Sequence, residues 1–279
     1  MPDVPHRPFS RLRLAAEDPG ADALIDDLVD FHTEHPGITE ATLGRFVTVD
    51  GLTGYDLLAR ALPAGARSVV DLGCGNGPLA ALLGDYEVIG IDGCDAEIAR
   101  ARARLPSARF VTARGDALPL ATASVDAVLS HHAVYLFAPI QPALAEVARV
   151  VRTGGLFAFA TFLPDDPADF PTLNALFASS SPLTKAVIPW FPGWGDRRMW
   201  SREGIDGLLA GAFAPVTVTT RTIALEGAPE ALSDVMLEFL YSAWLHEGDV
   251  RAELRARWTA ILASGRLELP CSVVKALRR

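Results

Sequence analysis

The sequence predicts an α/β fold built on one mostly parallel sheet that helices cover on both faces. Short β-branched runs alternate with segments of helical periodicity between residues 68 and 162. These runs are almost continuously apolar, as is typical of strands buried on both faces. Half of the 279 residues are hydrophobic and 21% are charged, so the chain can build a sizeable core.

Each element follows from its local pattern. Apolar residues at helical spacing predict a first helix at 21–35, which Pro36-Gly37 ends, and a second at about 53–62, which Pro63 ends. Apolar and β-branched runs predict strands at 68–72, 87–92, 109–112, 125–130, 156–162, 216–225 and 267–277. Helical spacing predicts the remaining helices at 78–83, 96–105, 142–151, 202–212, 229–246 and 249–264.

Composition divides the chain into four parts. Residues 1–52 form an N-terminal arm and helices that act as a cap, and residues 53–162 form the alternating core. The pattern breaks over residues 163–200, which are rich in proline and contain three tryptophans, so we expect an inserted cap or lid there. Residues 201–279 return to the core sheet with two inserted helices.

Charge and cysteine content exclude several classes. The 25 basic against 34 acidic residues give a net charge of −9, which argues against nucleic acid or an anionic membrane as partner. Residues 1–10 hold three prolines and no apolar run, so no secretory signal is expected, and no 18 apolar residues run together. Cys74, Cys94 and Cys271 form neither a CxxC pair nor an even disulfide framework. We expect a cytoplasmic protein without a metal site.

A glycine loop joins the first strand of the core to its helix. Asp71 is followed by Gly73, Gly75 and Gly77, and glycines let a ligand approach the bare backbone. Asp92 stands 21 residues after Asp71 at the tip of the second strand, where a carboxylate can bind ribose hydroxyls. Strand, loop, helix and acid together predict a nucleotide-like ligand.

The spacing of the loop favours one ligand class. A nicotinamide dinucleotide calls for GxGxxG, whereas this loop reads GxGxG with an acid before it. An acid beside the ligand suits a cationic group better than a pyrophosphate. S-adenosylmethionine carries an ammonium and a sulfonium and has no phosphate.

At these residues the chain resembles a class I S-adenosylmethionine-dependent methyltransferase, of the small-molecule branch that includes the ubiquinone/menaquinone C-methylases. The resemblance covers residues 55–162 well, and the strands at 216–225 and 267–277 fit the antiparallel edge of that family's sheet. It implies a Rossmann-like, doubly wound, seven-stranded sheet, mostly parallel with an antiparallel edge strand. It also implies S-adenosyl-L-methionine as cofactor and S-adenosyl-L-homocysteine as product.

The resemblance further implies which residues hold the cofactor. The loop that begins at Asp71 resembles the segment that holds the methionine part of the cofactor. Asp92, at the tip of the second strand, resembles the acid that binds the ribose. Asp116 and the N–H of Ala117 match the adenine-binding segment, and Ser130-His131 match backbone near the ligand's amino group. Tyr55 falls near a position that contacts the methionine carboxylate in some relatives. The implied set is Asp71, Gly73, Cys74, Gly75, Asp92, Gly93, Asp116, Ala117, Ser130 and His131.

The helix after Asp92 departs from the family pattern, because Cys94 stands where a serine often opens that helix. With Glu97 three residues later a capping box is nearly complete, but cysteine is a poor cap, and we expect Asp95 to cap instead. A solvated helix face is expected for Arg100, Arg102 and Arg104.

Catalytic candidates follow the fourth strand. Methyl transfer from a sulfonium depends mainly on alignment, but a hydroxyl acceptor also benefits from a base, which is usually histidine. His131 and His132 are adjacent, so only one of them is expected to face the reaction. Tyr135 either lines the acceptor pocket or packs in the core. Surface positions are expected for His6, His32, His35 and His246.

The sequence therefore predicts a methyltransferase for a small organic acceptor, with O-methylation of a secondary-metabolite hydroxyl or enol by direct displacement as the leading reaction. Transfer to carbon or nitrogen is an alternative. So is a methyltransferase-fold protein that uses the cofactor non-catalytically, as a cyclase would. A nicotinamide-dependent reductase is the least favoured class because of the loop spacing.

Overall fold

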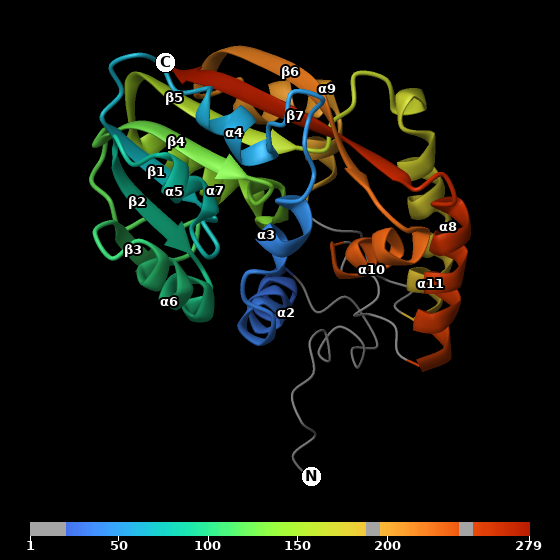
Figure 1. Cartoon of the computed structure of the whole chain (residues 1–279). Helices are drawn as coiled ribbons and strands as arrows, with labels where there is room; N and C mark the ends of the chain where they lie inside the picture. The colour runs from blue at the N-terminus through green and yellow to red at the C-terminus, as the bar shows by residue number, and fades with distance from the viewer. Residues whose placement is uncertain (1–20, 188–195, 240–247) are drawn as a thin grey trace.

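A computed structural model of the chain describes residues 21–187, 196–239 and 248–279 (Figure 1). Residues 1–20 of the expected N-terminal arm, and residues 188–195 of the expected lid with two of its three tryptophans, lie outside the described residues. No helix among those described is long and apolar enough to cross a membrane.

The described residues form one seven-stranded sheet, which confirms the expected fold class. Strands β1 to β5 run parallel, and β7 runs antiparallel to both β5 and the edge strand β6. In spatial order the strands are β3 (Arg109–Thr112), β2 (Glu87–Asp92), β1 (Ser68–Leu72), β4 (Val125–His131), β5 (Val151–Thr161), β7 (Arg266–Arg278) and β6 (Phe213–Glu226). The order reverses between β1 and β4, which is where ligands of such sheets bind, beyond the carboxyl ends of the strands.

Helices surround this sheet, and most lie within a few residues of their expected bounds. They are α2 (Ala21–Glu34), α3 (Ile38–Leu43), α4 (Gly54–Ala59), α5 (Pro78–Leu82), α6 (Asp95–Arg104), α7 (Ile140–Val150), α8 (Pro171–Val187), α9 (Arg202–Leu209), α10 (Pro229–Phe239) and α11 (Gly248–Ile261). Helix α2 packs on α6, and α8, α10 and α11 pack together beside the sheet (Figure 1). Helix α3 was not expected, because its six residues are too few to show a helical period.

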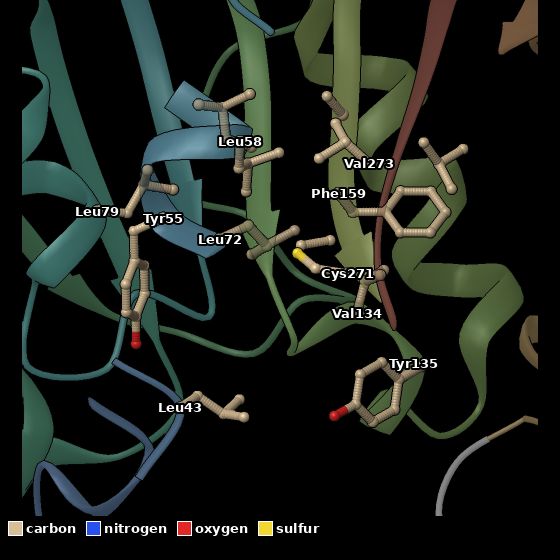
Figure 2. Packing of buried hydrophobic residues seen from close by; sticks show 14 of the residues in the cluster. Leu43, Tyr55, Leu58, Leu72, Leu79, Val134, Tyr135, Phe159, Cys271 and Val273 are labelled. Atoms are coloured by element: carbon tan, nitrogen blue, oxygen red, sulfur yellow. The ribbon is translucent and has the colours of Figure 1, made fainter. Parts of the chain in front are cut away.

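The core lies on both faces of the central strands. All seven residues of β4 are buried, as expected for a strand covered on both sides. Leu58 from α4, Leu72 from β1 and Phe159 from β5 are buried in one cluster (Figure 2). Burying one such side chain contributes about 1.5–3 kcal/mol to stability. This packing fixes the strand ends from which the site is built.

Candidate functional site

A cavity of about 350 Å³ is lined by the carboxyl ends of β1, β2 and β4 and by helix α2. The implied cofactor residues that line it are Asp71, Gly73, Cys74, Gly75, Asp92, Gly93, Asp116 and His131. Ser130 and Ala117 are not among its lining residues. The N–H of Ala117 donates to the carbonyl oxygen of Arg114 at 3.2 Å. The roles of both in cofactor binding stay predictions.

The glycine loop packs directly against the end of β4. Gly73 has φ +71°, and a Cβ added there would lie 2.3 Å from the Cβ of Ala133, so only glycine fits. The N–H of Gly75 donates to Asp92 Oδ2 at 2.8 Å, and Asp92 Oδ1 accepts the N–H of Cys94 at 2.9 Å. Asp92 thus orders the loop, and each of its oxygens keeps a second lone pair for a ligand hydroxyl.

Asp71 provides the test of whether a cationic ligand fits. Its side chain is 1% exposed, lines the cavity, and its Oδ2 has no hydrogen-bond partner. Burial raises the pKa of this carboxyl to about 7, with the nearby charge of Asp92 adding to the effect. A buried carboxylate oxygen without a partner is costly, and an ammonium group would satisfy it. The wall of the cavity therefore fits the cofactor that the loop spacing implied.

Asp116 also lines the cavity, from the turn after β3. Its carboxylate accepts from Arg114 Nε at 3.1 Å and Nη2 at 3.0 Å. Hydrogen bonds from that guanidinium lower the pKa of Asp116, so the carboxyl is ionised at neutral pH. An ionised carboxylate accepts hydrogen bonds, as recognition of an exocyclic amine requires.

Both histidines at the end of β4 line the cavity, so the expectation that only one would face the site is wrong. The reason is local: β4 ends at His131, and His132 has φ +50°, which breaks the strand's alternation. The ring of His131 stacks on Tyr55 with centroids 3.7 Å apart, and that of His132 stacks on Phe162 at 3.9 Å.

Both imidazoles are buried and keep ring nitrogens that can bind a ligand. Nδ1 of His131 and both ring nitrogens of His132 are buried without a hydrogen-bond partner. Burial lowers the pKa of His131 far below its usual value and that of His132 to about 3. Both rings are therefore neutral at pH 7, and each offers a lone pair to a hydroxyl.

Tyr135 lies beside the cavity and is not among its lining residues. The residue is 8% exposed, and its ring packs near those of Trp200 and Phe162, with centroids 5.8 and 6.4 Å away. The ring of Tyr135 thus packs among aromatic side chains. A catalytic role for Tyr135 stays a prediction.

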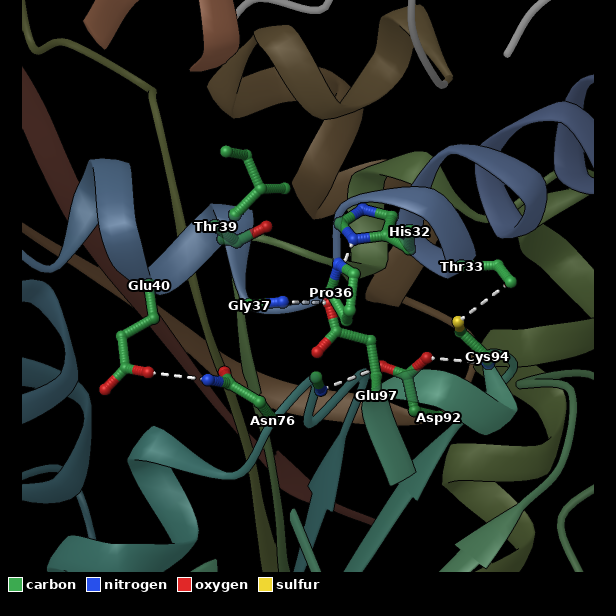
Figure 3. A network of polar contacts seen from close by, with 12 residues as sticks. His32, Thr33, Pro36, Gly37, Thr39, Glu40, Asn76, Asp92, Cys94 and Glu97 are labelled. Carbon is green, nitrogen blue, oxygen red and sulfur yellow. Dashed lines mark hydrogen bonds and ion pairs between the residues drawn. The ribbon is translucent and has the colours of Figure 1, made fainter. Parts of the chain in front are cut away.

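The N-terminal helices contribute a wall that the motifs did not indicate. Five residues of α2 line the cavity: Ile25, Asp26, Leu28, Val29 and His32. His32 is therefore not the surface residue that was expected, and its Nδ1 pairs with Glu97 Oε1 at 3.1 Å (Figure 3). This contact joins residues 65 positions apart, so no local sequence pattern predicts it.

Helix α6 also differs from expectation. Its N-cap, Cys94, makes no side-chain cap hydrogen bond, and Asp95 accepts from Thr112 Oγ1 at 2.5 Å instead of capping. The expected solvated arginine face is only partly right. Arg100 donates to the carbonyl of Pro36 at 2.7 Å, and Arg104 pairs with Glu40 at 2.6 Å, so both hold the N-terminal helices.

In the described ranges 21–187, 196–239 and 248–279, no group of three or more His, Cys, Asp or Glu side chains is arranged to hold a metal ion. The cavity is lined by a glycine loop, by carboxylates and by two imidazoles.

Comparison with known proteins identifies the family. Residues 70–159 match the family described as "Methyltransferase domain". The chain is 30% identical over 196 residues to a malonyl-[acyl-carrier protein] O-methyltransferase of Enterobacter lignolyticus, covering 69% of this chain and 72% of that protein.

Solved structures agree on the fold. The YcgJ protein of Bacillus subtilis has a TM-score of 0.58 at 16% identity, over 81% of this chain and 98% of that one. The [4+2]-cyclase SpnF has a TM-score of 0.55, also at 16% identity, over 95% and 97%. Identities this low show the shared fold alone. Taken with the sequence match, they establish that the chain belongs to the class I S-adenosylmethionine-dependent methyltransferases.

Proposed function

We propose that this methyltransferase acts on an oxygen of a small organic acceptor, a hydroxyl or enol of the kind found in secondary metabolites. The observation that carries the proposal is the pair of buried imidazoles with unpartnered nitrogens at the end of β4. The contact between Gly73 and Ala133 keeps that strand end against the loop assigned to the methionine part. An acceptor hydroxyl bound at the imidazoles would therefore lie near the transferable methyl group.

We assign each of three carboxylates to a different part of the cofactor. When bound, S-adenosylmethionine supplies a methyl group already activated by a positively charged sulfur. Asp71 would face the ammonium group, Asp92 would accept from the ribose hydroxyls, and Asp116 would accept from the adenine amine. Since the leaving group needs no further activation, alignment by these contacts is the enzyme's main contribution.

The histidines hold the acceptor and take its proton. A neutral imidazole accepts a hydrogen bond from a hydroxyl and orients its oxygen lone pair. Because burial makes both rings weak bases, they serve an acidic enol or phenol-like hydroxyl better than an ordinary alcohol. Helix α2, the described residues 163–187 and the aromatic side chains around Phe162 would enclose the acceptor.

A second candidate is transfer to a carboxylate oxygen. It is favoured by the similarity to the malonyl-[acyl-carrier protein] O-methyltransferase. A carboxylate arrives ionised, so it needs positioning and no base. The pH dependence of turnover separates the two, because only a hydroxyl acceptor requires removal of a proton.

Screening acceptors with isotopically labelled S-adenosylmethionine tests the function. The expected result is labelled O-methyl product together with release of S-adenosylhomocysteine. Label on carbon or nitrogen would overturn the oxygen assignment. Product formed with no release of S-adenosylhomocysteine would instead indicate the non-catalytic, cyclase-like use of the cofactor.

Substitution of the histidines tests their roles once an acceptor is found. If one of the histidines acts as the base, replacing it (His131→Ala or His132→Ala) should lower kcat roughly 10²-fold and leave cofactor affinity unchanged. The matched Gln variants retain hydrogen bonding and separate positioning from proton transfer. If all four variants keep kcat within about threefold and the same pH profile, neither histidine is the base.

A further inference from the structure

Glu97 is a buried carboxylate in the cofactor cavity that neither the glycine-loop motif nor the strand-tip acid accounts for. The residue is 2% exposed and lines the cavity from the first turns of α6. Its two oxygens have different surroundings. Oε1 is bonded to the N-terminal helices, whereas Oε2 is buried with no partner.

Oε1 holds the turn between α2 and α3. It accepts the N–H of Gly37 at 2.8 Å and pairs with His32 Nδ1 at 3.1 Å (Figure 3). Gly37 has φ +85°, and a Cβ added there would lie 3.1 Å from both Asn76 Nδ2 and Arg100 Nη1. The turn thus packs closely against Asn76 and Arg100. Helix α2, which precedes the turn, forms a wall of the cavity.

Oε2 lies over the glycine loop. A Cβ added to Gly75 would lie 3.9 Å from this oxygen. The N–H of Gly75 donates to Asp92, the acid assigned to the ribose hydroxyls. Figure 3 shows Glu97 between the Gly37 turn and Asp92. An unpartnered buried carboxylate oxygen is costly, so this position fits a hydrogen-bond donor that arrives with the ligand.

We propose that Glu97 is a further cofactor-binding residue, whose Oε2 accepts from a ribose hydroxyl beside the one held by Asp92. The same carboxylate then links two events. The cofactor fixes the side chain through Oε2, and the fixed side chain holds the Gly37 turn, and with it helix α2, through Oε1. The inference rests on the assigned cofactor site and is independent of the acceptor.

Binding of S-adenosylhomocysteine and of its 2′-deoxy and 3′-deoxy analogues, measured by calorimetry, tests the contact. In the natural sequence, loss of the hydroxyl bound by Glu97 should raise Kd about tenfold. In Glu97→Gln the same loss should raise Kd only about twofold, because the charge-assisted acceptor is already gone.

Glu40→Gln is the matched control. Glu40 joins the same helices to the core through Asn76 and Arg104, each at 2.6 Å, but it is not among the residues that line the cavity. In this variant each deoxy analogue should lose as much affinity as in the natural sequence. Equal losses in the natural protein and in Glu97→Gln, for both analogues, would show that Glu97 only holds the helices.

Hydrogen exchange of the natural protein gives a readout that needs no variant to fold. S-adenosylhomocysteine should slow exchange of the Gly37 amide roughly threefold or more, and the deoxy analogue that lacks the Glu97 contact should slow it less at equal saturation. Equal protection by all three ligands would overturn the link between ribose and turn. Absence of any binding would overturn the cofactor site itself, which is a different failure.

Discussion

We expect Asp71 to make cofactor affinity depend on pH. Its carboxyl is buried, and its pKa is raised to about 7 in the free protein. The ligand's ammonium would bind the ionised carboxylate, so below pH 7 binding would first have to remove a proton. Affinity for S-adenosylhomocysteine should therefore fall as the pH decreases through this range, and the free protein should release protons on binding.

The size of the effect follows from the ionised fraction. A carboxyl with a pKa of about 7 is roughly 76% ionised at pH 7.5 and roughly 3% ionised at pH 5.5. Kd should therefore rise roughly 25-fold between these values, or about 1.9 kcal/mol. The raised pKa of Asp92 acts in the same direction, while His132, whose pKa burial lowers to about 3, stays neutral throughout.

Calorimetry between pH 5.5 and 7.5 at constant ionic strength measures this dependence. Repeating each titration in buffers of different ionisation enthalpy counts the protons released, which should approach one per ligand at pH 5.5. Asp71→Asn should bind more weakly at pH 7.5 and lose most of the pH dependence. A flat Kd with no proton release, in protein shown to be folded at both ends, would refute the role assigned to Asp71.

Three further outcomes are expected. Asp92→Ala should weaken S-adenosylhomocysteine binding by about 1–3 kcal/mol in calorimetry, and an unchanged Kd would remove Asp92 from the site. Gly73→Ala should destabilise the fold by about 2 kcal/mol or more in thermal unfolding, because the new Cβ would lie 2.3 Å from that of Ala133. Gly211→Ala is the control, because the structure leaves open space there. If Gly73→Ala lowers stability no more than Gly211→Ala does, the packing is contradicted. Ligand or product should slow proteolysis within residues 163–187, and identical cleavage rates would count against a cap there.

The parts of the site that lie within one stretch of sequence were predictable, and the parts joined across the fold were not. The loop after β1 and the acid at the tip of β2 are local patterns with a direct chemical meaning, and both line the cavity as expected. The partnership of His32 with Glu97 depends on how α2 packs on α6, which no spacing reveals.

The two histidines show a second limit. Strand alternation places only one of them toward the site, and that rule holds as long as the strand continues. It fails at His132 because the backbone leaves the strand there with a positive φ. Spacing in the sequence does not reveal a single-residue conformation of this kind, in which the imidazole stacks on the ring of Phe162.

The close approach of Gly73 to Ala133, where an added Cβ would lie 2.3 Å from the Cβ of Ala133, has a consequence for redesign of the enzyme. The glycine loop and the strand end that carries the imidazoles form one closely packed block, and a larger side chain at Gly73 would force the two apart. New acceptors must be accommodated by the opposite walls. Directed libraries should therefore concentrate on Ile25, Leu28 and Val29 of α2, which border the cavity without belonging to that block.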